Sequence, residues 1–231
     1  MNDETFSLII PAAGSGSRMG LDSNKLLIPL AGKPVLWHTV RAFSMNPRLC
    51  EIVVVVRPEE KPIIQEILRD LQITVPVHYA IGGFTRQQSV LSGLYAAQST
   101  SYVWVHDGAR PFVSQALQQR ILEKMISTEP LTVAVPVKDT IKRVSQDGTV
   151  LETLNRSELW SIQTPQIFQR ELLIAAHRAA ESAGMEATDD ASLIEWFGHP
   201  VRIVMGDYQN IKLTTPEDMI MGENILKTMK G

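Results

Sequence analysis

Cysteine is almost absent from this sequence, since Cys50 is the only one among 231 residues. An intramolecular disulfide and a cysteine-based metal site each need a second thiol, so neither can form. Because the sequence suggests no His or Asn partner for Cys50, we expect it to pack as a small apolar residue at the start of a strand. The sparse use of cysteine fits a reducing compartment, and we expect a cytoplasmic protein.

Long apolar runs and an excess of charge are also missing. No apolar stretch approaches the length of a membrane span, and the acidic start Met1–Glu4 lacks the apolar segment of a signal peptide. The net charge of −3 gives no general attraction to nucleic acid or to an acidic membrane. We therefore expect neither kind of partner, and an anionic ligand must be held by a few Arg and Lys side chains.

What the chain does contain is an alternation of apolar runs with amphipathic segments. The run 52–56 has no polar alternation, which is typical of a strand buried on both faces of a parallel sheet. Strands are predicted over 6–10, 51–56 and 75–81, and helices over 34–44 and 59–71. This order predicts an α/β fold, a Rossmann-like, mostly parallel sheet flanked by helices, with ligands at the carboxyl ends of the strands. At this length we expect one domain over 1–231.

The second half adds a feature that does not suit a central parallel sheet. Polar residues alternate with apolar ones on both sides of Asp147-Gly148, a strong hairpin signal, and predict a projecting β-hairpin arm at about 137–157. Thr188 or Asp189 is expected to cap a helix, which favours a structural role for Asp189 and Asp190. The remaining predicted elements are strands at 132–137, 201–205 and 210–214, a strand entering a loop over 159–166, and helices over 114–127, 170–183 and 216–230.

A loop of small residues, Pro11–Gly20, follows the first strand. Gly14 and Gly16 let several backbone amides point into one concavity, and Arg18 and Lys25 add full positive charges. This combination predicts a phosphate-binding loop, with a tight turn and two solvated basic residues as the alternative.

The loop matches neither of the two commonest nucleotide-binding patterns. Its glycines are spaced G-x-G-x-x-x-G, and the strand 52–56 ends in Arg57-Pro58 with no carboxylate for a ribose hydroxyl, which argues against an NAD-dependent dehydrogenase. No G-x-x-x-x-G-K-[ST] motif occurs, because the triplet 32–34 lacks the hydroxyl that would bind the metal.

Two more strand ends carry polar groups. Gly82-Gly83 permits close backbone approach and Ser89 offers a hydroxyl, although a glycine turn with Ser89 as a local cap is the alternative. After the run 102–105, Asp107 can orient Mg²⁺ or a substrate hydroxyl, and we favour this over structural pairing with Arg110. Arg110 itself can bind a phosphate as a planar fork. His106 is expected merely to fill space.

Taken together, these motifs resemble the 2-C-methyl-D-erythritol 4-phosphate cytidylyltransferase family, in the nucleotidyltransferase superfamily. The resemblance spans almost the whole chain, in order. It rests on Pro11-Ala12-Ala13-Gly14-x-Gly16-x-Arg18-Met19, Asn24-Lys25, Gly82-Gly83-x-x-Arg86-x-x-Ser89-Val90, His106-Asp107-Gly108-Ala109-Arg110-Pro111, Pro136-x-x-Asp139-Thr140, Gln163-Thr164-Pro165-Gln166, Thr188-Asp189-Asp190-Ala191-Ser192 and Asn210-Ile211-Lys212.

The resemblance implies that CMP passes from CTP to methylerythritol 4-phosphate and that pyrophosphate leaves. It implies Mg²⁺ held mainly by CTP phosphates, with no dedicated metal cage in the protein. The implied catalytic residues are Arg18, Lys25, Arg156 and Lys212. The implied CTP-binding residues are Ala12, Ala13, Gly14, Gly16, Gly82, Gly83, Ser89 and Gly108. The implied residues around the acceptor substrate are Asp107, Arg110, Thr140, Arg156, Thr164 and Lys212.

The resemblance also implies a homodimer with arm exchange, in which Thr140 and Arg156 serve the partner's active site. Two positions depart from the common family pattern: Phe84 stands where an acidic residue often follows the glycines, and Leu26 stands where Gln is frequent. The alternatives are a cytidylyltransferase for ribitol 5-phosphate or another polyol phosphate, and a non-catalytic nucleotide-binding protein. Arg18 and Lys25 oppose the second alternative, because a protein that only binds CTP needs neither at the α-phosphate.

Overall fold

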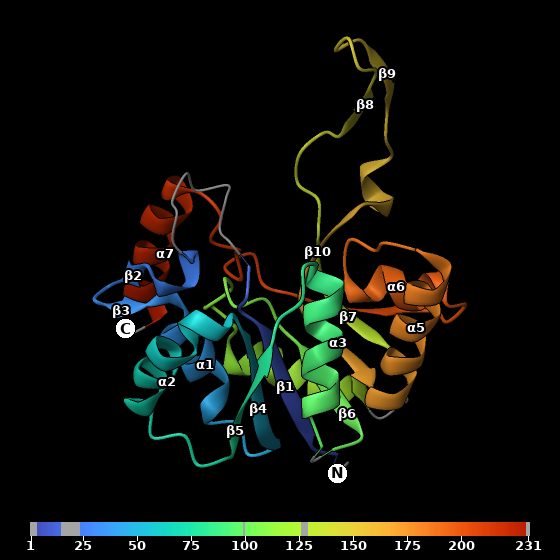
Figure 1. Ribbon diagram of the computed structural model, residues 1–231. Helices are drawn as coiled ribbons and strands as arrows, with labels where there is room; N and C mark the ends of the chain where they lie inside the picture. The colour runs from blue at the N-terminus through green and yellow to red at the C-terminus, as the bar shows by residue number, and fades with distance from the viewer. Residues whose placement is uncertain (1–3, 15–23, 99, 126–128, 230–231) are drawn as a thin grey trace.

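A seven-stranded sheet in the order β11-β7-β10-β6-β1-β4-β5 forms the centre of the molecule in the computed structural model (Figure 1). The structure describes residues 4–14, 24–98, 100–125 and 129–229. The strands of this sheet are β1 (Phe6–Pro11), β4 (Leu49–Val56), β5 (Val77–Ile81), β6 (Tyr102–Val105), β7 (Leu131–Pro136), β10 (Trp160–Gln169) and β11 (Arg202–Met205). Two short pairs lie apart from it: β2 (Pro29–Leu30) with β3 (Lys33–Pro34), and β8 (Lys142–Val144) with β9 (Val150–Thr153).

Helices cover both faces of the sheet. They are α1 (Val35–Ser44), α2 (Lys61–Arg69), α3 (Arg86–Ala96), α4 (Gln115–Lys124), α5 (Arg170–Ala183), α6 (Asp190–Trp196) and α7 (Pro216–Met229). In β4, Val54 packs in one apolar cluster with α1, α2, α4 and α7, whereas Val55 packs in a second cluster with α3, α5 and α6. Because each face is buried under helices, the run 52–56 has no polar alternation. The predicted mostly parallel α/β fold is confirmed.

One strand runs against the others. β1 is parallel to β4 and β6, β4 to β5, and β7 to β11, but β10 is antiparallel to both β6 and β7. The sequence predicted a strand entering a loop over 159–166, and the strand in fact continues to Gln169. The amino end of β10 therefore lies at the edge where the parallel strands have their carboxyl ends.

The predicted hairpin is present as β8 and β9 and projects from that same edge (Figure 1). Its base is closed by the Val137 N–H, which donates to the Leu159 carbonyl oxygen at 3.0 Å. At its tip Gly148 has φ +87°, a conformation that favours glycine. We call residues 137–159 the arm.

The predicted strand over 210–214 is wrong. This segment is irregular, and it is tied to the chain after β6 by the Leu213 N–H, which donates to the Ala109 carbonyl at 2.8 Å. The loop still has a fixed place, because Leu213 is buried. Within the described part of the chain, no helix has the length and apolar character needed to cross a bilayer.

Candidate active site

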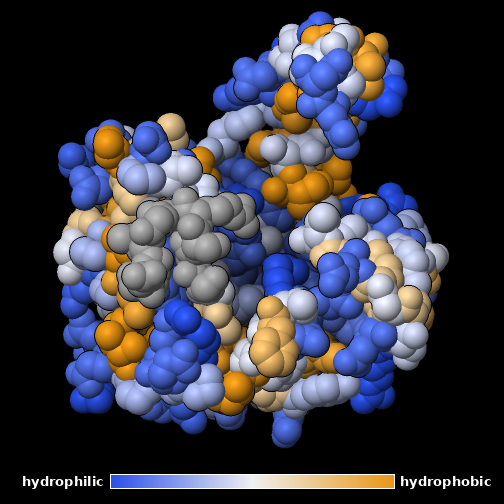
Figure 2. All heavy atoms as spheres, turned by 45° about the horizontal axis from the view of Figure 1, so that its top comes forward, coloured by the Kyte–Doolittle hydropathy of each residue, from blue (hydrophilic) through white to orange (hydrophobic). Residues whose placement is uncertain are grey.

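A cavity of about 400 Å³ opens at the carboxyl edge of the sheet. Figure 2 looks down on this edge and shows a hydrophilic hollow below the arm. Four separate stretches of chain line the cavity: the loop after β1, the turn before α3, the loop after β6 and the loop before α7. The described residues that line it are Pro11, Ala13, Gly14, Asn24, Lys25, Leu26, Gly83, Phe84, Thr85, Arg86, Ser89, Asp107, Gly108, Ala109 and Lys212.

The structure brings together about half of the residues predicted from the sequence. Those that line the cavity are Ala13, Gly14, Lys25, Gly83, Ser89, Asp107, Gly108 and Lys212. Ala12 and Gly82 belong to the same two loops without lining it, and Arg110 and Thr164 lie close to Asp107. Thr140 and Arg156 are exposed on the arm. Gly16 and Arg18 lie outside the described residues.

Asn24 holds the loop after β1 in place. Its side-chain amide donates to the Ala12 carbonyl at 2.7 Å and to Glu60 Oε2 at 2.9 Å, and its Oδ1 accepts the Leu26 N–H at 3.1 Å. Glu60 is in turn paired with Arg57. Asn24 therefore starts the short helix η2 (Lys25–Leu27) and positions the backbone of Lys25 at the cavity.

The turn before α3 packs tightly against this loop. A Cβ on Gly82 would lie 2.4 Å from the Ala13 Cβ, so only glycine fits there. The Ser89 hydroxyl donates to the Thr85 carbonyl at 3.0 Å and accepts the Gly83 N–H at 3.1 Å. The N-cap of α3 is Thr85, in a capping box with Gln88, so the alternative that Ser89 is the cap is wrong.

Asp107 lies among three cationic side chains. Its Oδ2 is 2.7 Å from Lys212 Nζ and 3.6 Å from Arg110 Nε, and its Oδ1 is 4.0 Å from Arg86 Nε. Burial acts to raise the pKa of the carboxyl, but Lys212, Arg86 and Arg110 outweigh it and hold the pKa far below its ordinary value. Asp107 is therefore ionised. The pairing with Arg110 exists, but the shortest of these contacts is with Lys212, on the cavity wall.

Arg86 links the cavity to Asp190, a buried acid for which the sequence predicted a structural role. Its Nη2 is 2.7 Å from Asp190 Oδ2, and Asp190 Oδ1 is 3.2 Å from His177 Nε2. Burial would lower the pKa of Arg86, but Asp190 and Asp107 raise it, so the guanidinium stays charged. Asp189 caps α6 as expected, whereas Asp190 points a buried charge at Arg86. The signal available in the sequence was Arg86 itself, inside the Gly82–Val90 motif.

His106 connects three of the predicted residues. The Asp107 N–H donates to Thr164 Oγ1 at 2.9 Å, that hydroxyl lies 3.0 Å from His106 Nδ1, and His106 Nε2 lies 2.9 Å from the Arg110 carbonyl. The carbonyl can only accept, so Nε2 carries the proton and Nδ1 accepts from Thr164. Burial lowers the pKa of His106 from 6.5 to about 4. The prediction that His106 merely fills space is wrong, because the neutral ring positions the loop that carries Asp107.

Both terminal nitrogens of Arg110 donate to backbone carbonyl groups. Its Nη1 donates to the Asn210 carbonyl at 2.8 Å, and its Nη2 donates to the Ile162 carbonyl at 3.4 Å. It does not belong to the described lining of the cavity. In this arrangement Arg110 ties the loop before α7 to β10, and its predicted contact with a substrate phosphate stays a prediction.

The donor set at the cavity can be compared with the needs of Mg²⁺. Asp107 is the one carboxylate among the described residues that line it, and no group of three His, Cys, Asp or Glu side chains suited to a metal occurs in the described ranges. Mg²⁺ is often held by one or two carboxylates together with substrate phosphates and water. The residues present fit an ion that arrives with a polyphosphate.

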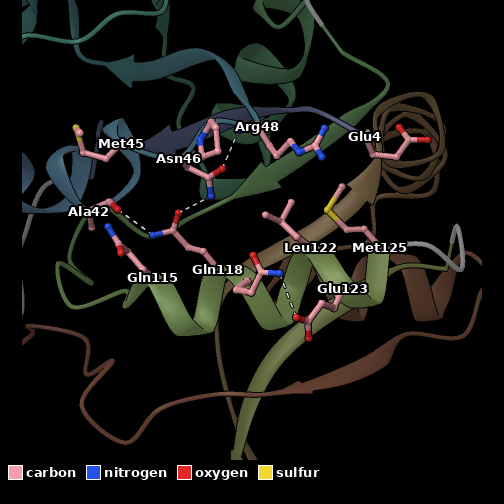
Figure 3. A pocket seen from close by; sticks show the side chains of 12 residues that line it. Glu4, Ala42, Met45, Asn46, Arg48, Gln115, Gln118, Leu122, Glu123 and Met125 are labelled. Atoms are coloured by element: carbon pink, nitrogen blue, oxygen red, sulfur yellow. Dashed lines mark hydrogen bonds between the residues drawn. The ribbon is translucent and has the colours of Figure 1, made fainter. Parts of the chain in front are cut away.

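A separate cavity of about 510 Å³ lies between the end of α1 and helix α4, towards the amino ends of β1 and β4 (Figure 3). It contains none of the predicted site residues. Asn46 Nδ2 donates to Gln118 Oε1, and Gln118 Nε2 donates to the Ala42 carbonyl, both at 2.8 Å. These amides are engaged in tying α4 to α1, so we place the active site at the carboxyl edge.

Proteins of one family are similar to this chain over almost its whole length. The family model described as IspD, 2-C-methyl-D-erythritol 4-phosphate cytidylyltransferase, matches residues 6–228. Proteins of that name from Bacillus licheniformis and Halalkalibacterium halodurans are each 45% identical to this chain. The first alignment spans 225 residues, 97% of both chains, and the second spans 221 residues, 96% of both.

Solved structures agree with the sequences. The crystal structure of 4-diphosphocytidyl-2C-methyl-D-erythritol synthase from Anaerococcus prevotii superimposes with a TM-score of 0.85 at 33% identity, covering 98% of this chain and 100% of that one. The cytidylyltransferase from Thermus thermophilus gives a TM-score of 0.80, also at 33% identity, covering 96% and 99%. Because sequence and fold agree over nearly the full length, the chain belongs to the 2-C-methyl-D-erythritol 4-phosphate cytidylyltransferase family.

Proposed function

We propose that this protein is an enzyme that transfers CMP from CTP to 2-C-methyl-D-erythritol 4-phosphate, forming 4-diphosphocytidyl-2-C-methyl-D-erythritol and pyrophosphate, and that residues 1–231 act as one domain. The observation that carries the proposal is the cavity, where Lys25, Lys212 and Asp107 meet beside a wall of small residues. Membership of the family supports the identity of both substrates. We also propose that the protein is located in the cytoplasm. A chain with a single cysteine cannot form an intramolecular disulfide, which fits a reducing compartment.

The chemistry needs positioning and positive charge more than a covalent nucleophile. A phosphate oxygen of the acceptor attacks the α-phosphorus of CTP in line, the new P–O bond forms, and the bond to the β-phosphate oxygen breaks. Negative charge gathers on the oxygens of the α-phosphate and on the departing pyrophosphate. We assign Lys25 and Lys212, together with Arg18, to the stabilisation of that charge, because fixed cations in a partly closed site act more strongly than in water.

Each remaining group has a proposed place. Ala12, Ala13, Gly14, Gly16, Gly82, Gly83, Ser89 and Gly108 bind the nucleotide, and Asp107, Arg110, Thr164 and Lys212 serve the acceptor. Asp107 would contribute a ligand to an Mg²⁺ ion that is held mainly by the triphosphate oxygens. When bound there, Mg²⁺ neutralises charge on the leaving pyrophosphate.

The arm supports the proposal of a homodimer. Val144, Val150 and Leu151 are each more than half exposed on it, and apolar surface gathers on the arm and at its base (Figure 2). A free hairpin with such a surface gains stability when another chain covers it. We propose that the arm crosses to a second copy, where Thr140 and Arg156 complete the partner's site.

Pyrophosphate release from CTP with Mg²⁺ tests this function. We expect release with methylerythritol 4-phosphate, no release with ribitol 5-phosphate, and loss of the activity in Arg18→Ala and Lys212→Ala variants. Release with ribitol 5-phosphate alone would keep the site and overturn the acceptor. No release with either acceptor, from a protein that binds CTP, would favour the non-catalytic alternative.

A further inference from the structure

Phe84 is a fully exposed aromatic residue at the edge of the active-site cavity. Its side chain has a relative exposure of 104%, the largest value among the exposed large apolar residues of the described chain, and it belongs to the lining of the cavity. Exposing a whole phenylalanine ring to water is unfavourable, because the ring loses the gain of burial. A residue of this kind beside a ligand cavity requires an explanation.

Local structure does not supply one. Phe84 directly precedes Thr85, the N-cap of α3, a position where an apolar side chain often packs against the fourth residue of the helix. That residue is Ser89, whose hydroxyl is bonded to the Gly83 N–H and the Thr85 carbonyl. The ring of Phe84 therefore has no apolar partner at this position of α3.

The backbone of Phe84 is nevertheless held firmly. Its N–H donates to Gln88 Oε1 at 2.9 Å, and the same oxygen accepts the Thr85 N–H at 3.3 Å. At the preceding residue, a Cβ added to Gly83 would lie 2.4 Å from the Gln88 Cβ, so the turn is closely packed. The ring is thus presented from a fixed base, which reduces the entropy lost when a ligand orders it.

The cavity offers a surface that suits a flat ligand. Ala13 and Gly14 line it from the loop after β1, and Gly83 lines it from the turn that carries Phe84. The cationic side chains that suit phosphates, Lys25 and Lys212, line the same cavity. A nucleotide has one charged part and one planar aromatic part, and Phe84 is the one aromatic residue among the described residues of the lining.

We propose that the ring of Phe84 stacks on the nucleobase of the bound nucleotide and supplies affinity for it without selecting cytosine. The proposal rests on the CTP-dependent function above and adds a residue to its nucleotide site. Aromatic stacking is tolerant of base identity, because every base has a π face. Discrimination between CTP and UTP is then made by hydrogen-bonding groups in the loop after β1 and in the turn before α3.

Isothermal titration of CTP and of UTP, without acceptor, tests the proposal. We expect Phe84→Leu to weaken CTP binding about 5- to 150-fold, the range of single base-stacking losses, and to weaken UTP binding by the same factor. Phe84→Tyr, which keeps the ring, should bind within about twofold of the wild type. Tyr95→Leu, which removes a partly exposed aromatic residue of α3 outside the cavity, is the matched control and should change neither affinity.

A spectroscopic readout is independent of affinity. In a Phe84→Trp variant, CTP should quench the added indole fluorescence beyond any change seen in the wild type, which has four tryptophans of its own. Equal CTP affinity in the wild type and Phe84→Leu would overturn the proposal, as would a loss for CTP alone. A change of oligomeric state in Phe84→Leu with unchanged affinity would also overturn it and assign the ring to a subunit contact.

Failure of the stacking proposal can be distinguished from failure of the proposed function. Pyrophosphate release by the wild type with methylerythritol 4-phosphate is measured on the same preparations. Stacking without release would leave the Phe84 proposal standing and remove the proposed reaction. Release with no difference between Phe84→Leu and the wild type in CTP binding would do the reverse.

Discussion

The ammonium nitrogen of Lys212 lies 2.7 Å from Oδ2 of Asp107, so the loop before α7 is joined by a charged contact to the loop after β6. The contact holds a cation at the cavity wall without neutralising the site, because Asp107 also faces Arg86 and Arg110. Of the three cations around Asp107, Lys212 is therefore the one that can bind a phosphate with little loss in the free energy of unfolding.

Replacing Lys212 by Ala should reduce kcat/KM by about 100- to 1000-fold, the usual loss for one preorganised group that stabilises transition-state charge. The free energy of unfolding should change little, since Asp107 keeps two other cations. Steady-state kinetics and urea unfolding of the same preparations measure both effects. A variant that loses activity only in proportion to its folded fraction would show that Lys212 is structural.

His106 gives a pH dependence of stability with a defined direction. Its pKa falls from 6.5 to about 4 on folding, so between these values the unfolded chain binds a proton that the folded protein does not. The stabilisation is complete above pH 6.5 and is lost as the pH falls towards 4. The shift corresponds to about 3 kcal/mol over this window.

Urea unfolding of the wild type and of His106→Gln, at intervals across that window, isolates this contribution. The glutamine amide keeps a donor for the Arg110 carbonyl and does not titrate, whereas every other group titrates in both proteins. We expect a steeper loss of stability with acid in the wild type. Parallel curves would mean that folding leaves the pKa of His106 unchanged.

Gly82→Ala should separate the two loops that form the nucleotide side of the cavity. The added Cβ would lie 2.4 Å from the Ala13 Cβ, and we expect a loss of stability of about 1–3 kcal/mol together with weaker CTP binding. Gly14→Ala is the control for stability, because a Cβ there meets nothing within 4 Å among the described residues. Chemical unfolding and CTP titration provide the measurements, and equal stabilities of the two variants would contradict the packing argument.

Asp190→Asn should destabilise the protein by about 1.5–3 kcal/mol, because it removes the negative charge that Arg86 contacts most closely, while Arg86 stays partly exposed at the cavity. Burial acts to raise the pKa of Asp190, but Arg86 and His177 outweigh it, so the carboxylate is charged in the folded protein. Glu171→Gln removes an exposed partner of Arg170 and should cost less than about 1 kcal/mol. Guanidinium unfolding of both variants measures the loss in free energy of unfolding. Similar losses for the two variants would show that Asp190 stabilises the protein no more than an exposed ion pair does.

Mixing two inactive variants tests whether the arm serves a second subunit. Lys25→Ala damages the cavity, and Arg156→Ala damages the arm. If arms are exchanged, a mixed dimer has one site with intact Lys25 and an intact Arg156 from the other chain. Random mixing should then restore about a quarter of the wild-type activity. An arm that served its own chain would give no recovery.

The sheet could largely be predicted because its signals are local. The unbroken apolar run in β4 indicates a strand buried on both faces, and Asp147-Gly148 indicates a hairpin whatever surrounds it. The direction of β10 was not predictable in this way, since antiparallel pairing depends on which strands it meets. The segment 210–214 alternates in polarity like a strand, but Leu213 is buried there by a loop that packs against the chain after β6.

Site residues could be predicted where they belong to a short sequence motif whose residue types already indicate the chemistry. Lys25, Asp107 and Lys212 all line the cavity, because the loops and the short helix that carry them lie at the edge where the parallel strands have their carboxyl ends. The positioning role of His106 could not be predicted, because it depends on a hydrogen bond with Thr164, which lies 58 residues away in the sequence. The pairing of Arg86 with Asp190 joins residues 104 apart, and one sequence alone gives no sign of such a contact.

The reversed direction of β10 has a consequence for how this family can vary. Because β7 ends and β10 begins at the same edge, as neighbours joined by one hydrogen bond between Val137 and Leu159, a short turn would connect them equally well. The arm is thus an insertion whose length and surface can change without altering the register of any strand below it. The surface that the arm presents can therefore change while the strands that carry the cavity residues keep their register.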